Sequence, residues 1–409
     1  MTKIKSALLM KGSLPANTSP VFLQKESSQK NADDKTAIVL APPYSFQALS
    51  ELYDMNSYHS RCCKVKAGVT VLLGYSIYDP DDDGRRPDEN SKKIDTLLKN
   101  SLIDLYNVQL DHEIFGNGYI EIVRNSKKEI TELYHIPARD SGLMLKDRGV
   151  LLKQVIGSTE IFYKLFEGED YNTGDSRHEF IQLKNYNPNS RHYGVPDYMG
   201  AISAMYLDNS ANEYNTRRFM NNAVPDSIIK MYGFDKDSDT ESDIKNFFQG
   251  NFKGIENAGK VLLLWAEAKD GNEIEIEKMG SEIREASFRG LRMDNREEIL
   301  AAHGVPARLA GVESAAKLSG GNETREQLKL FNEIVIIPKQ KILAGVLNEI
   351  IEKGMNIKNW KMKFNTFEFA NAAEDAAFYQ TMVSSGILDP DEARIEMGYQ
   401  AKKRNSAGE

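Results

Sequence analysis

Cysteine and histidine are scarce in this sequence, which has 409 residues but only two cysteines and six histidines. Cys62 and Cys63 are adjacent, so no disulfide framework and no four-cysteine zinc site can form. Long apolar runs are also missing: residues 261–266 form one of the longest, whereas a membrane-spanning helix needs about 20 apolar residues. We therefore expect neither a membrane span nor a membrane partner, and a chain that stays in the cytoplasm.

Positive charge is in deficit, with 52 Lys and Arg against 60 Asp and Glu and a formal net charge of -8. This balance argues against a protein that coats nucleic acid by neutralising phosphates, although it allows one that handles DNA without gripping it. Residues 223–280 carry twelve acids against seven lysines, so most of the excess lies there. Hydrophobic residues make up 41%, which is enough for two or three regions with a sizeable core.

Hydrophobic periodicity in the first half predicts mixed helix and sheet. Residues 1–35 are rich in Ser, Asn, Lys and Gln and are typical of a flexible arm with little core. Apolar spacing predicts helices over residues 46–55 and 91–117, the second ended by the turn at 116–118, and β-branched residues predict a strand over 69–78. Five short β-rich runs then predict an antiparallel sheet: residues 119–123, 133–136, 150–155, 161–166 and 180–183.

The second half is predicted to be mainly helical around an inserted α/β module. Long helices are expected after Pro196 and from 281 to 303, separated by strands at 227–232, 260–265 and 273–277 and a helix at 241–248. A Gly/Ser/Ala-rich loop over 307–321 is too long for an ordinary connection, which favours a functional or mobile segment. Later elements are a helix over 323–354 kinked at Pro338, a strand at 360–364, a helix at 372–384 and a last helix opening at Asp389.

Three short motifs resemble known sites but lack part of the required pattern. Residues 254–260 match the first seven positions of a phosphate-binding loop, yet Val261 replaces the hydroxyl residue and the loop leads into a strand instead of a helix. Residues 79–84 copy the start of a calcium loop, but Asn90 stands at the position of the bidentate Glu, so a solvated acidic turn is favoured. His59, Cys62 and Cys63 offer metal ligands without a fourth partner nearby, which favours packing roles. With no catalytic motif recognisable, the sequence indicates a scaffold more than an enzyme.

Five stretches, in a fixed order, carry a family resemblance. They are Phe-Gly-Asn-Gly-Tyr-Ile-Glu-Ile at 115–122, Leu-Tyr-His-Ile-Pro-Ala-Arg at 133–139, the Tyr-Gly-Val-Pro segment within 187–198 leading to a helix that ends at 218–225, residues 296–312, and Ile-Leu-Asp-Pro-Asp-Glu-Ala-Arg at 387–394. In this order they resemble the portal proteins of tailed bacteriophages and prophages, over roughly residues 40–400.

The resemblance implies an α+β portal fold in which two stem helices flank an α/β clip. It places the N-terminal part of the wing at 36–195, the stem helices at 196–222 and 281–304, the clip at 223–280, the tunnel loop at 305–321, the kinked tunnel helix at 322–354, a wing return strand at 355–365 and a helical crown at 366–409. Residues 1–35, the predicted arm, lie outside the matched stretches.

The same resemblance implies a function. A portal forms a dodecameric ring at one capsid vertex, through which double-stranded DNA is packaged and ejected without sequence preference. The implied partners are other copies of the chain, the large terminase subunit, the major capsid or scaffold protein and a head-completion adaptor. We expect no cofactor and no catalysis, a role in initiating capsid assembly, and a location in the virion after assembly in the host cytoplasm.

Two groups of residues are the candidates for contact with DNA and partners. In the tunnel loop, Lys317 is the one base between 309 and 321 and is a candidate for touching passing phosphates; an ordinary exposed lysine is the alternative. The further loop candidates are Leu309, Glu313, Ser314 and Ser319. In the clip, Glu273, Glu275 and Glu277 alternate with isoleucines and would share one face of a strand, either toward a channel or partner or simply toward solvent. Two rival functions remain open, a different ring-forming neck or secretion adaptor and a nucleotide-dependent enzyme built on Lys260.

Overall fold

A computed structural model describes residues 28–30, 38–82, 85–146, 149–166, 178–221, 227–231, 274–278, 282–312, 321–367 and 372–397. Several predictions therefore lie outside the described residues: the phosphate-loop motif at 254–260, the strand at 260–265, the helix at 241–248 and most of the arm at 1–35. Within that arm, however, residues 28–30 form an edge strand, so the predicted arm does contribute to the sheet.

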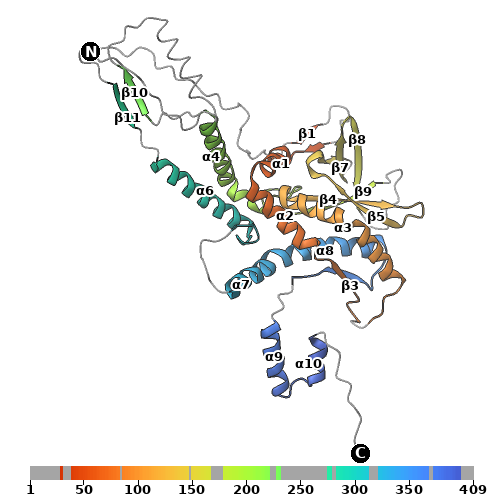
Figure 1. Ribbon diagram of the computed structural model, residues 1–409. Helices are drawn as coiled ribbons and strands as arrows, with labels where there is room; N and C mark the ends of the chain where they lie inside the picture. Colours follow the sequence, from red (N-terminus) through yellow and green to blue (C-terminus); the bar gives the residue numbers. More distant parts are fainter. Residues whose placement is uncertain are drawn as a thin grey trace, which may run out of the picture.

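An eight-stranded sheet forms the body of the molecule, on the right of Figure 1. All neighbouring strands are antiparallel except β8 and β9, which are parallel, so the prediction of an antiparallel sheet holds for every pair but one. In spatial order the strands are β1 (Ser28–Lys30), β2 (Ile38–Leu40), β6 (Ser141–Lys146), β7 (Gly149–Ile156), β8 (Thr159–Leu165), β9 (His178–Lys184), β4 (Asn117–Arg124) and β5 (Ile130–Ile136).

Three helices lie between β2 and β4 in the chain, α1 (Phe46–Met55), α2 (Ser57–Val71) and α3 (Glu89–Phe115), and α3 packs on β4 and β5 of the sheet. The predictions of α1 and α3 are confirmed, and α3 ends where Gly116 adopts a left-handed φ of 69°. The strand predicted over 69–78 is wrong in its first part, because α2 continues to Val71 and only β3 (Tyr75–Tyr78) is extended. Helix α2 is buried around much of its circumference, so it lacks the one-sided apolar pattern by which helices are recognised in a sequence.

Segments from both ends of the chain close the sheet region. The predicted return strand is present as β12 (Lys361–Phe364), which pairs antiparallel with β3 so that Phe364 lies opposite Tyr75. Helix α8 (Ile337–Glu349) packs against β12, and Leu343 and Leu347 join a core with Ile120 of β4. The body therefore depends on residues from both halves of the chain.

Two long helices leave the body side by side (Figure 1). Helix α4 (Ile202–Asn221) follows the short 3₁₀ turn η3 (Asp197–Ala201), and α6 (Glu282–His303) returns along it. Beyond their far ends, β10 (Ser227–Met231) and β11 (Ile274–Lys278) form an antiparallel pair. Both predicted helices and the outer strands of the inserted module are confirmed, with the third strand shifted by one residue.

The helix predicted over 323–354 is continuous in helical structure but not regular. It consists of α7 (Gly321–Phe331), a π-helical segment η5 (Asn332–Ile336), α8 and a second π segment η6 (Ile350–Gly354). Pro338 lies at the start of α8, directly after the first π segment, where its missing N–H and its ring are accommodated by the wider turn. The irregularity expected at Pro338 is therefore a π segment.

The last described residues form two short helices, α9 (Ala372–Ser384) and α10 (Pro390–Glu396), both as predicted. At the start of α10, the Glu392 side chain accepts a hydrogen bond from the backbone N–H of Asp389 at 2.9 Å, which completes a capping box. In the described part of the chain, no helix has the length and apolar character required to cross a bilayer.

Candidate functional site

The candidate loop residues divide between described and undescribed parts of the chain. Leu309 lies in the turns that follow α6, whereas Glu313, Ser314, Lys317 and Ser319 lie outside the described residues. Gly304 ends α6 with a φ of 63°, and Val305 donates from its backbone N–H to the carbonyl of Leu300 at 3.1 Å. This is the hydrogen bond of a Schellman-type helix end.

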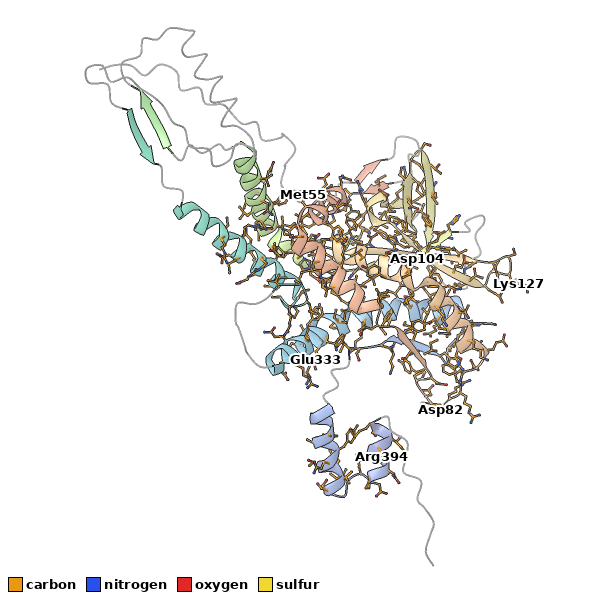
Figure 2. The ribbon with its side chains drawn as sticks, viewed as in Figure 1. Met55, Asp82, Asp104, Lys127, Glu333 and Arg394 are labelled. Carbon is orange, nitrogen blue, oxygen red and sulfur yellow. The ribbon has the colours of Figure 1, made fainter. Side chains whose placement is uncertain are left out.

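The base of that loop is packed against the core. Leu309 and Val305 join a cluster with Leu300 of α6 and with Phe331 and Ile336 around the first π segment, near the labelled Glu333 (Figure 2). Both sides of the loop are thus held by one hydrophobic cluster, which fixes where residues 313–320 leave the body.

The clip candidates lie on a paired strand. Glu275 of β11 lies opposite Lys230 of β10, and Glu277 lies opposite Ile228. Ile276 pairs with Ile229 and Ile274 with Met231, so apolar positions meet on one face of the pair, while the other face carries the glutamates, as the alternation of Glu and Ile predicts. Glu273 lies one residue before the described strand.

The most strongly connected polar site is one that the sequence did not reveal, a buried ionic cluster where α2, α3, η3 and α8 meet. Glu113 of α3 contacts Lys66 Nζ at 2.5 Å with one carboxylate oxygen and Lys339 Nζ at 3.0 Å with the other. Lys339 also contacts the Asp197 carboxylate at 2.8 Å. The Lys66 and Glu113 side chains are 1% exposed, so these charges are compensated by each other and not by water.

This arrangement governs the protonation of the cluster. Burial alone would raise the pKa of Glu113, but the adjacent Lys66 and Lys339 outweigh it and hold that pKa at about 2. Burial likewise opposes ionisation of Asp197, and Lys339 reverses this effect and lowers its pKa. The pKa of Lys339 is raised because the attraction of Glu113 and Asp197 exceeds the cost of its burial. All three groups stay charged at neutral pH.

A second buried cluster joins α2 to the end of α6. His59 Nδ1 lies 2.9 Å from His303 Nε2, and Cys63 Sγ lies 3.8 Å from His59 Nδ1. Tyr198 of η3 stacks on His303, with ring centroids 5.2 Å apart, and also packs on His59. Burial lowers the pKa of His59 to about 3 and that of His303 well below its ordinary value, so both rings are neutral.

The three residues that the sequence offered as possible metal ligands, His59, Cys62 and Cys63, do not all lie together. Cys62 does not belong with His59, because it packs into the other cluster with Val65 and Leu300. Among the residues that the structure describes, His59, Cys63 and His303 form a group that could hold a metal, with ligand atoms within 4.8 Å of one another. At the acidic turn, Asp79 is 5% exposed and accepts from Arg85 Nη1 at 2.7 Å, so it is a paired structural residue and not the solvated carboxylate that we expected.

A third polar contact ties both long helices to α2. Asp208 of α4 accepts from Asn56 Nδ2 at 3.2 Å and from Arg292 Nε of α6 at 3.0 Å. Asn56 is also the N-cap of α2, since its Oδ1 accepts from the backbone N–H of His59 at 3.0 Å. Met55, at the end of α1, lies beside the base of α4 (Figure 2).

Three of the five stretches that carry the family resemblance, the first, the third and the fourth, are in contact with one another. Asn117 donates to the carbonyl of Gly194 at 3.0 Å and accepts from its N–H at 2.7 Å, which joins the first stretch to the third. Tyr198 of the third stretch donates to the carbonyl of Ile114 and stacks on His303 of the fourth. The sequence indicated that these residues matter, because they lie in the stretches that carry the resemblance. It could not indicate which of them are in contact, because the partners lie 77 or more positions apart in the chain.

Comparison with known proteins agrees with this architecture. A family model described as phage portal protein matches residues 59–398. The uncharacterized protein YqbA of Bacillus subtilis (strain 168) is 22% identical to this chain. The alignment covers 96% of this chain and 87% of YqbA. The probable portal protein of Haemophilus phage HP1 is 26% identical, over 62% of this chain and 67% of that protein.

Solved structures show the same fold. A chain from the virion of a native gene transfer agent particle superposes with a TM-score of 0.62 at 18% identity, over 89% of this chain and 96% of that one. A chain from the neck of the native particle, computed with C12 symmetry, gives the same TM-score and coverage.

Proposed function

Because the chain belongs to the phage portal protein family, we propose that it forms a dodecameric ring at one vertex of a capsid, the channel through which DNA is packaged and ejected. The observation that carries this proposal is the extent of the family match, which spans both long helices, the loop base and α8. The chain acts as a structural part of the virion, assembled in the host cytoplasm, and not as an enzyme. It also offers a nucleus for capsid assembly through contacts with the capsid or scaffold protein.

Exposed apolar side chains support self-association along the two long helices. Leu207 of α4 is 51% exposed, and Leu291 and Met293 of α6 are each 38% exposed. In a ring, neighbouring copies would cover such side chains, since removal of apolar area from water favours association. The similar gene transfer agent neck, which was computed with C12 symmetry, supports a twelve-fold arrangement.

Electron microscopy of the purified chain tests the ring. We expect closed rings with a central hole and mainly twelve subunits. A monodisperse monomer at high concentration would contradict the proposal. A ring of another subunit number would support the channel and revise the stoichiometry.

The loop at 305–321 is proposed to line the channel, with Leu309 at its packed base and Glu313, Ser314, Lys317 and Ser319 beyond it. Lys317 would touch phosphates weakly and without sequence preference, because a tight contact would stall the movement of DNA. Lys317→Glu is expected to reduce DNA packaging or retention while rings still form. The control is Lys329→Glu on the exposed face of α7, and equal packaging by both variants would contradict the contact.

The module carried by β10 and β11 is proposed as the docking site for the large terminase subunit and later for the head-completion adaptor. Its net charge of -5 over residues 223–280 supports a partner with a basic surface, with Glu273, Glu275 and Glu277 as the contact candidates. Replacing these three residues by Lys is expected to abolish binding of the large terminase subunit at low salt while rings persist. Unchanged binding would assign the docking to another surface.

A further inference from the structure

We propose that His59, Cys63 and His303 form a buried binding site for one soft metal ion, with Cu⁺ as the ion that the site fits best. The three residues are between 0% and 3% exposed and come from two elements, α2 and the end of α6. His59 and Cys63 are four residues apart, so both project from one face of α2 toward His303.

The distances fit a metal centre. An ion bound at about 2.1 Å to nitrogen and 2.3 Å to sulfur holds two nitrogens roughly 3.4 Å apart, and a nitrogen and a sulfur roughly 3.6 Å apart. The corresponding distances here are 2.9 Å between the histidine nitrogens and 3.8 Å between Cys63 Sγ and His59 Nδ1. One ion would therefore require the histidine nitrogens to separate by about 0.5 Å and Cys63 Sγ to approach His59 Nδ1 by about 0.2 Å. The third pair, Cys63 Sγ and His303 Nε2, lies within 4.8 Å.

The protonation of the rings is compatible with metal binding. A metal binds the neutral form of imidazole, and the two nitrogens that face each other, His59 Nδ1 and His303 Nε2, are the ones that would hold the ion. In the bound state the ring protons would occupy His59 Nε2 and His303 Nδ1. Within the described residues these two atoms are buried and have no hydrogen-bond partner. Binding of the ion releases the Cys63 thiol proton to solvent and involves no change of oxidation state.

Charge and ligand type select the ion. Thiolate is a soft ligand and imidazole a borderline one, a combination that suits Cu⁺ and Zn²⁺ and disfavours Mg²⁺ and Ca²⁺. With two neutral histidines and one thiolate, Cu⁺ gives a centre of zero net charge, whereas Zn²⁺ leaves one positive charge on a centre whose three ligands are buried. Three protein ligands also satisfy Cu⁺ but leave a zinc ion one ligand short.

Anaerobic titration of the purified full-length chain with Cu⁺, against a chromophoric competing chelator, tests the site. We expect one tightly bound Cu⁺ per chain, and X-ray absorption of the loaded protein showing one sulfur and two nitrogen ligands. Cys63→Ser is expected to weaken binding by at least about 100-fold, the upper end of the loss seen for residues that merely support a ligand. Cys62→Ser is the matched control, because Cys62 is the other buried thiol and points into a different cluster.

Each outcome decides the proposal. Wild-type protein that binds no Cu⁺ and no Zn²⁺, or loaded protein without a sulfur ligand, overturns it and leaves His59 and His303 as a hydrogen-bonded pair only. Equal loss in both cysteine variants also overturns it. Tighter binding of Zn²⁺ by the same residues supports the site and overturns the preference for Cu⁺. If Cys63→Ser does not fold, the ligand set of the loaded wild type and the binding by His303→Asn decide.

Discussion

At the scale of single residues, Gly194 shows how closely two distant stretches of the chain approach. A Cβ built at this position would lie 2.0 Å from the carbonyl oxygen of Gly116 and 2.6 Å from the backbone nitrogen of Asn185. Backbone atoms cannot move aside as a flexible side chain can, so glycine is required here by space and not by φ.

We therefore predict that Gly194→Ala lowers the free energy of unfolding by about 3 kcal/mol or more, which chemical denaturation measures. Gly200→Ala is the matched control, since a Cβ there meets nothing within 4 Å. We expect Gly200→Ala to leave the free energy of unfolding unchanged or to raise it by up to about 1 kcal/mol. Similar losses in the two variants would contradict the tight approach.

His112 is a second residue with a measurable signature. It is 3% exposed, and burial, reinforced by Lys339, lowers its pKa to about 4. A depressed folded-state pKa means that the unfolded chain binds the proton more readily, so the stabilisation present above about pH 6.5 is lost as the pH falls toward 4.

His112→Leu is predicted to remove this dependence. Between pH 6 and pH 4 the unfolding free energy of the variant should fall less steeply, by up to about 1.4 kcal/mol per pH unit. The variant His178→Asn, at a half-exposed histidine whose Nδ1 lies 2.6 Å from Glu121 Oε1, serves as the control. A wild-type slope in His112→Leu would show that His112 is not held neutral.

At the scale of elements, Asn56 both starts α2 and holds α4. Its Oδ1 caps the helix through the N–H of His59, and its Nδ2 donates to Asp208. Asn56→Ala is predicted to lower the unfolding free energy by about 2–3 kcal/mol, about 1 from the cap and the rest from the hydrogen bond to a charged partner. Asn56→Ser keeps a capping oxygen and should recover about 1 kcal/mol. Equal values for Ala and Ser in thermal or urea denaturation would show that the cap contributes nothing.

The helical run from Gly321 to Gly354 contains two π-helical segments, and the sequence indicated an irregularity near the first of them. Pro338 indicated that the helix could not be regular, and the structure places a π segment directly before it. The second π segment, at Ile350–Gly354, has no proline and was not expected. Such a segment depends on packing around the helix, which the residues of the helix alone do not reveal.

At the scale of the whole molecule, Lys339 links three parts of the chain. It lies on α8, and its side chain contacts α3 and the turn η3 that precedes α4. It contacts Glu113 and Asp197, and all three charges are partly or fully removed from water. Replacement of Lys339 by Met would leave Asp197 without its cation and Glu113 with Lys66 alone.

We predict that Lys339→Met lowers the unfolding free energy by about 3 kcal/mol at pH 7. Because the pKa of Glu113 is held at about 2, this contribution is present above about pH 4.5 and is lost as the pH falls toward 2, so wild type and variant converge only in acid. Lys341→Met, at an exposed position of the same helix, is the control for loss of a cation. Denaturation at pH 7 and pH 3 measures both differences, and equal stability of the two variants would contradict the role of the cluster.

The sequence by itself predicted most of the helices, five of the eight strands of the main sheet, the family and the stretches of chain that carry the resemblance, but not α2, β1, β2 or β6. These follow from local patterns, since the alternation in 119–123, the cap at Asp389 and the turn at Gly116 act on nearby residues. Tertiary structure decided that α2 is a helix buried on many sides, that Cys63 and not Cys62 faces His59, and that His303 meets them from 244 positions away. It also placed Lys66, Glu113, Asp197 and Lys339 in one cluster. Local propensity carries no information about such pairs, because their energy arises only when the chain is folded and water is excluded from between them.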